Sequence, residues 1–205
     1  MANSYTQVPP NSTGNKMRTR TRIQGADTVH EQALFQGAFP TFYALADNVA
    51  LAANKHHIAI FNQAGSNQVI SIKKIFQINL SLSAVTGVAL RFDIKRATAV
   101  SAGTAITAQS MDSTDAALSN VTINTNGTVT EGALLYPYIT QSDEVTAANT
   151  AVSNYLTQYG NIALESPEMK EVRLNPGEGV TIKQITSSTV GSFAWLVAFT
   201  VESTV

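Results

Sequence analysis

The sequence predicts an all-β protein: a β-sandwich of jelly-roll type with an extended N-terminal arm and one short helix insertion. Three observations carry this prediction. Apolar residues alternate with polar ones over several segments, turn-forming pairs separate these segments, and a basic stretch without acidic residues precedes them. Alternation with a period of two is typical of a strand that buries one face. We expect two parts, an arm over residues 1–27 and a β-sandwich domain over residues 28–205.

The arm is defined by its charge. Residues 1–26 contain four cations and no acidic residue, so they carry +4, and the net charge of −1 leaves −5 for the rest of the chain. The cations are Lys16, Arg18, Arg20 and Arg22. In an extended chain this spacing points all four to one side. We keep two hypotheses: a solvated terminus, or an arm that docks on an acidic neighbour such as another copy of the body. Four charges are too few for us to expect nucleic acid.

The strands of the body follow from the alternation. Residues 70–82 are apolar at every even position except Lys74, which predicts one long strand with one buried face. Residues 88–95 repeat the pattern, and residues 193–201 are apolar at nearly every position, as in a central strand covered on both sides. Shorter strands are expected at residues 56–62, 121–130, 169–174 and 180–185.

Turn and helix signals complete the prediction. Asn126-Gly127 is a preferred pair for a type I′ hairpin, and Asn175-Pro176-Gly177 suits a type II turn. Residues 143–159 predict a helix, because Ser142 can cap it and its apolar positions share one helical face. Residues 99–119 have no clear period, and we expect a long loop there.

The composition excludes several kinds of chemistry. Only 13% of the 205 residues are charged, against about 25% in an average globular protein, while 44% are apolar. There is no cysteine, which rules out disulfides, thiolate zinc sites, iron–sulfur clusters and cysteine nucleophiles. No signal peptide is visible, and no apolar run is long enough for a membrane helix. The small net charge of −1 favours neither a membrane nor a nucleic-acid partner.

The two adjacent histidines are the first place to look for a metal site or a base. On a regular strand, His56 would share a face with Ile58 and Ile60, and His57 with Ala59 and Phe61, so one ion could not bind both. We expect hydrogen-bonded structural roles for both histidines.

No other pattern predicts catalysis. The carboxylate pairs Asp112/Asp115 and Asp143/Glu144 match no calcium-binding loop, and residues 177–179 (GEG) lack the lysine of a phosphate loop. We therefore expect no enzyme activity, no catalytic residues, no cofactor and no metal site.

Five segments spread over most of the chain carry a family resemblance. They are residues 6–16 (TQVPPNSTGNK), 18–22 (RTRTR), 29–32 (VHEQ), 55–62 (KHHIAIFN) and 175–179 (NPGEG), the last followed by a Trp-bearing final strand. In these segments the chain resembles the virion structural proteins of tailed bacteriophages, among them capsid decoration or cement proteins. The resemblance implies a component of the virion. We expect it on the capsid surface, and made in the host cytoplasm without a signal peptide.

Together with the basic arm and the predicted sandwich, the resemblance favours a non-enzymatic capsid decoration or cement protein that stabilises the phage head through its sandwich and its arm. Its partners would be the major capsid protein, copies of itself in a homo-oligomer, or both, with no membrane and no nucleic acid. The candidate arm contacts are Lys16, Arg18, Arg20 and Arg22. A neck, tail or head-fibre component is the alternative, which copy number on the particle would distinguish.

A carbohydrate-binding adhesin module is a further alternative. Such modules use exposed aromatic side chains as stacking platforms, and the tyrosines to consider are Tyr136, Tyr138, Tyr155 and Tyr159. The last two lie on the apolar face of the predicted helix, so we expect them in the core. Tyr136 and Tyr138 are therefore the better candidates.

Overall fold

The computed structural model describes residues 3–7, 16–24, 27–32, 39–79, 89–141, 156–161 and 171–203. The chain divides into two compact units, residues 1–38 and residues 39–205. Every regular element in the described ranges is a β-strand, and none of these residues belongs to a helix that could cross a membrane. The all-β prediction is confirmed.

The N-terminal unit is a small antiparallel sheet. It consists of β1 (Asn3–Gln7), β2 (Lys16–Gln24) and β3 (Asp27–Gln32), with β2 in the middle. The basic segment of the predicted arm is therefore the central strand of a sheet. Threonine, isoleucine and arginine alternate along β2, and the β-branched residues among them favour extended backbone. Three strands also stabilise one another better than an isolated hairpin would.

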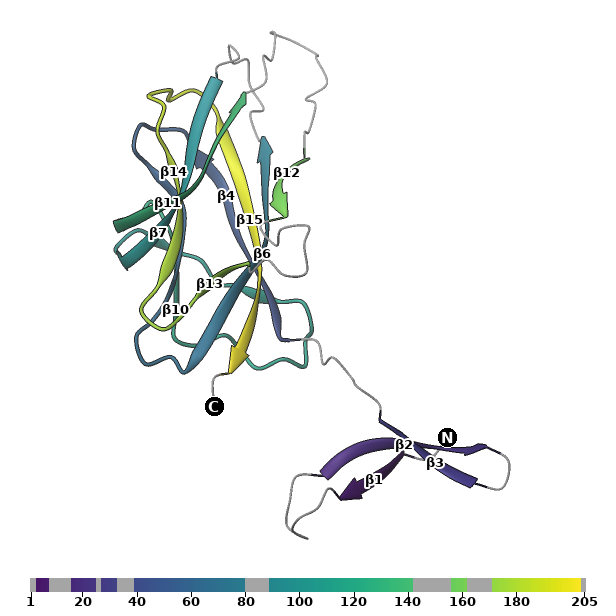
Figure 1. Ribbon diagram of the computed structural model, residues 1–205. Coiled ribbons are helices and arrows are strands. Elements are labelled where there is room, and N and C mark those ends of the chain that lie inside the picture. Colours follow the sequence, from purple (N-terminus) through teal and green to yellow (C-terminus); the bar gives the residue numbers. More distant parts are fainter. Residues whose placement is uncertain are drawn as a thin grey trace. The chain divides into compact units, whose positions relative to one another are not determined.

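The body is a β-sandwich of two antiparallel sheets, which Figure 1 shows face to face. The first sheet has the order β11-β7-β14-β5-β10-β8, and the second has the order β12-β6-β15-β4-β9, with β13 also pairing to β6. The strands are β4 (Thr41–Ala50), β5 (His56–Asn62), β6 (Gln68–Asn79), β7 (Ala89–Ser101), β8 (Thr104–Ala105), β9 (Gln109–Ser110), β10 (Val121–Thr125), β11 (Thr128–Gln141), β12 (Leu156–Asn161), β13 (Val172–Leu174), β14 (Gly179–Gln184) and β15 (Ser192–Ser203).

The core lies between the two sheets and is centred on Trp195. This side chain is fully buried and packs against the rings of Phe92, Phe193 and His57, with ring centroids 5.1, 6.4 and 6.0 Å away. Large aromatic side chains supply much of the apolar area that such a core removes from water. As predicted, β15 is a central strand, with β6 on one side and β4 on the other. The predicted cover over both of its faces is incomplete, because Leu196 and Ala198 on the outer face are only half-buried.

A bulge in β6 changes which side chains of the long predicted strand face the core. Opposite β15, Ile72 pairs with Phe199 and Lys74 with Ala198, so Lys73 is the extra residue. Ile72 is buried before the bulge and Ile75 after it, whereas Phe76 is only half-buried. The prediction of one buried face at the even positions is therefore wrong beyond Lys73, because an inserted residue shifts the alternation by one.

The predicted helix is wrong where the structure describes it. Leu156–Asn161 forms strand β12, which pairs with β6 at the edge of the second sheet. The rest of the predicted helix, including Tyr155, lies outside the described residues. Backbone hydrogen bonds to an open neighbouring strand decide the conformation here, and a single sequence does not reveal that neighbour.

The two predicted turns have different outcomes. The turn at residues 175–177 is confirmed, because Glu178 N donates to Asn175 O over 3.0 Å and Gly177 has a φ of 85°. The hairpin at Asn126-Gly127 is wrong, because β10 pairs with β5 and β8 while β11 pairs with β7. Residues 99–119 are mostly irregular, as predicted, apart from the end of β7 and the short strands β8 and β9.

Candidate interaction sites

The four candidate arm cations all lie on β2. They occupy alternate positions, where Lys16 is opposite Gln7 and Arg18 is opposite Tyr5 of β1. Arg20 lies opposite Asn3 on one side and Glu31 on the other, and Arg22 lies opposite Val29. The strand thus brings four positive residues together at a repeat of about 7 Å.

His57 is a buried structural residue with both ring nitrogens occupied. Trp195 Nε1 donates to His57 Nδ1 over 3.0 Å, so the other nitrogen, Nε2, carries the proton and donates to Gln184 Oε1, also over 3.0 Å. Burial is the main cause that lowers the pKa of His57, to about 4. The ring is neutral at pH 7, and neither nitrogen is open to a metal ion.

A second bulge explains which way the histidines point. Opposite β14, Ile58 pairs with Ile182 and His56 with Lys183, so His57 is the extra residue on β5. His57 therefore shares the core face with Ile58. The predicted opposite orientation of the two histidines is confirmed, but their predicted neighbours are exchanged, because the bulge shifts the alternation.

His56 lies on the outer side of the first sheet, in an ionic cluster that the sequence analysis missed. Lys183 Nζ and Lys95 Nζ donate to the Glu131 carboxylate over 2.5 and 2.6 Å. His56 Nε2 lies 3.5 Å from the same carboxylate. His56 Nδ1 is 3.0 Å from the Thr181 hydroxyl, which itself donates to the Ile58 carbonyl. Burial lowers the pKa of His56, and the two lysines add to this effect while Glu131 opposes it.

Glu131 is held in its charged form. Burial opposes ionisation, but hydrogen bonds and charges from Lys183 and Lys95 outweigh it and lower the pKa of Glu131 to about 2. Such a carboxylate is a poor proton donor near neutral pH, so the cluster joins β11, β7, β14 and β5 as an ionic cross-link. No spacing along the sequence signals this cluster, because its charged residues come from separate strands.

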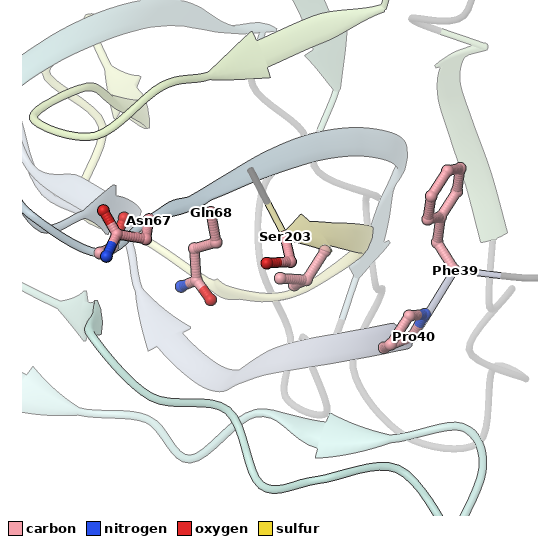
Figure 2. A pocket seen from close by; sticks show the side chains of 7 residues that line it. Phe39, Pro40, Asn67, Gln68 and Ser203 are labelled. Carbon is pink, nitrogen blue, oxygen red and sulfur yellow. The ribbon is translucent and has the colours of Figure 1, made fainter. Parts of the chain in front are cut away.

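A shallow pocket of about 400 Å³ opens at one end of the second sheet, where β4 and β6 begin and β15 ends. Figure 2 shows Asn67 and Gln68 on one side of it, Phe39 and Pro40 on the other, and Ser203 between them. The described residues that line it are all uncharged, and the Ser66 hydroxyl is buried without a hydrogen-bond partner among the residues that the structure describes. The pocket has room for a small neutral group or ordered water.

Of the two tyrosines preferred for a stacking platform, Tyr136 and Tyr138, only the first is exposed. Tyr138 is buried and stacks on Phe92 with ring centroids 5.5 Å apart, so it belongs to the core. Tyr136 is 54% exposed on β11, where Leu134 and Ile139 are also exposed. Tyr159 lies on strand β12 and not on a helix. A single exposed tyrosine is a weaker basis for sugar stacking than the pair that the sequence suggested.

The remaining candidates show no metal centre. Asp112 accepts hydrogen bonds from the backbone and hydroxyl of Thr114, which lower the pKa of this exposed carboxyl, and Asp115 accepts one from Ser110. Both residues thus stabilise their own turn. Within the described ranges, no three histidine or acidic side chains come close enough to hold a metal ion. Comparison of the chain with protein-family models, curated proteins and solved structures found no match.

Proposed function

We propose that this protein is a non-enzymatic structural component of a tailed-bacteriophage particle, a decoration or cement protein on the capsid surface. The observation that carries the proposal is the division of charge between two compact units. Residues 1–38 contain four cations and two acidic residues, whereas residues 39–205 contain nine cations and twelve acidic residues. A small basic unit attached to an acidic body can bind the body of a neighbouring copy or an acidic region of the shell.

The strand order of the body supports a jelly-roll assignment. The eight longer strands fall into two groups of four, β12-β6-β15-β4 and β11-β7-β14-β5. Along the chain, every connection between them except β7 to β11 passes from one group to the other. This arrangement supports a jelly roll, an architecture found in viral capsid and lectin domains. A fold by itself does not define a function, so the jelly roll is compatible with the proposal without deciding it.

The first test is the copy number of the chain in purified particles, measured by quantitative mass spectrometry against the major capsid protein. A ratio near one, or near a simple fraction of the shell copy number, is expected for decoration. A ratio that matches only a ring or a few spikes would place the protein in the neck, tail or fibres. Absence from the particle would overturn the proposal.

The second test concerns the basic strand. We expect Arg18→Glu combined with Arg22→Glu to abolish binding of the purified full chain to particles that lack it. Arg20 is left unchanged because a glutamate there would lie opposite Glu31. The matched control is Arg18→Lys with Arg22→Lys, which keeps the charge and should bind normally. Unchanged binding of the glutamate variant would refute the role of β2.

A further inference from the structure

The outer side of the second sheet carries a row of apolar side chains over three neighbouring strands. The pairing of β15 places Leu196 opposite Leu45 of β4 and opposite Phe76 of β6, and Figure 1 shows these three strands adjacent in the sheet. The row faces away from the core, because the residues on either side of Leu196, Trp195 and Val197, are buried in it. Leu45 is 41% exposed, and Leu196 and Phe76 are half-buried.

Opposite charges lie at two diagonal corners of this face. On one side of the apolar row, Tyr43, Ala198 and Lys74 are paired across the strands. On the other side, Ala194 pairs with Ile78 but is buried, and a register shift on β4 leaves Asp47 and Asn48 opposite it. Lys74 and Asp47 are both exposed, and neither forms an ion pair with any residue in the described ranges. With ordinary strand and residue spacings, the two corners are roughly 17 Å apart.

We infer that this face binds the same face of a second copy. The two copies are related by a two-fold axis that lies in the interface and passes over Leu196. Because this axis is perpendicular to the line from Lys74 to Asp47, it exchanges the two corners. Each lysine then faces the partner's aspartate, and the two apolar rows cross at Leu196. The strands of the two copies cross at roughly 70°, close to the orthogonal class of sheet packing.

The charge pattern is what selects a second copy as the occupant. A two-fold interface requires a surface that is complementary to itself, and one cation and one anion at equal distances from an apolar centre meet that requirement. Eight residues of this face are exposed or half-buried, fewer than the roughly 20–30 residues per partner of a standard interface, so we expect a weak dimer, detectable from about tens of micromolar upward. The inference does not depend on the proposed phage function.

The test is the dissociation constant of the full chain, measured by sedimentation equilibrium over a concentration series. Lys74→Glu and Asp47→Lys should each weaken the dimer roughly tenfold, because each creates two like-charge pairs. The double variant should restore the wild-type constant, because the exchanged charges again face each other. A double variant as weak as the singles would refute the crossed arrangement.

The apolar row has its own matched test. Leu45→Ser should abolish the dimer, whereas Leu134→Ser should leave it unchanged. Leu134 is a leucine of similar exposure, 46%, but it lies on the edge strand β11 of the other sheet. A wild-type chain that stays monomeric up to about 1 mM, or a dimer that survives Leu45→Ser, would overturn the inference.

Discussion

Lowering the pH from 7 to 5 should destabilise the folded protein by about 2 kcal/mol through His57. In the unfolded chain this imidazole has its ordinary pKa of about 6.5, whereas in the fold burial lowers its pKa to about 4. Between these two values the unfolded chain binds the proton and the folded protein does not. Stability therefore rises with pH through this window and is level above it. Below pH 4 the full difference between the two pKa values is lost from the free energy of unfolding, which corresponds to about 3 kcal/mol.

The structure gives the reason why protonation is costly. A proton on Nδ1 would meet the Trp195 Nε1–H, which already donates to that nitrogen over 3.0 Å. The bond from Nε2–H to Gln184 Oε1 is the same in both protonation states, so it does not offset the clash at Nδ1. The network is satisfied only when the imidazole is neutral.

The assay is urea unfolding at a series of pH values, followed by the fluorescence of Trp195, the chain's single tryptophan. His57→Phe should lose about 1–3 kcal/mol at pH 7, because Trp195 Nε1 is left without its acceptor. Its stability should then change much less than that of the wild type between pH 7 and 5. His56→Gln is the control and should keep most of the dependence. A His57→Phe protein with the wild-type pH dependence would refute the reasoning.

Two further predictions concern the first sheet. Glu131→Gln should lower the free energy of unfolding by about 1–2 kcal/mol in chemical denaturation, because Lys95 and Lys183 lose their shared counter-ion. A loss smaller than about 0.5 kcal/mol would contradict this. Gly179→Ala should lower the stability by about 2–3 kcal/mol, because the new Cβ would lie 2.7 Å from the Ile60 carbonyl. Gly65→Ala is the control in thermal melts, because open space surrounds that position. Only its φ of 80° opposes the substitution, which should lower the stability by about 1 kcal/mol.

Local bulges are the reason why the sequence does not predict which side chains form the sites. The alternation at residues 70–82 and 56–62 correctly predicts β6 and β5, because apolar periodicity reports burial directly. The alternation does not predict which residues face the core after the bulge at Lys73 in β6 or at the bulge at His57 in β5. An inserted residue is stabilised by its neighbouring strands, β15 in one case and β14 in the other, and both lie far away in the sequence.

The ionic cluster shows the same limit. Lys95, Glu131 and Lys183 come from three strands, and no spacing along the chain relates them. The apolar row of Leu45, Leu196 and Phe76 is also assembled from three strands. Residue identities provide the groups, but only the strand register places them together.

The sequence alone therefore determines the class of fold, the excluded chemistries and the position of the basic segment, because composition, periodicity and charge are local properties. The tertiary structure decides which strands are neighbours, that Leu156–Asn161 is a strand, and which face each side chain occupies. These outcomes depend on hydrogen bonds between segments that lie far apart in the sequence. The free energy of a strand is set mainly by the strands beside it, and a single sequence does not specify those neighbours.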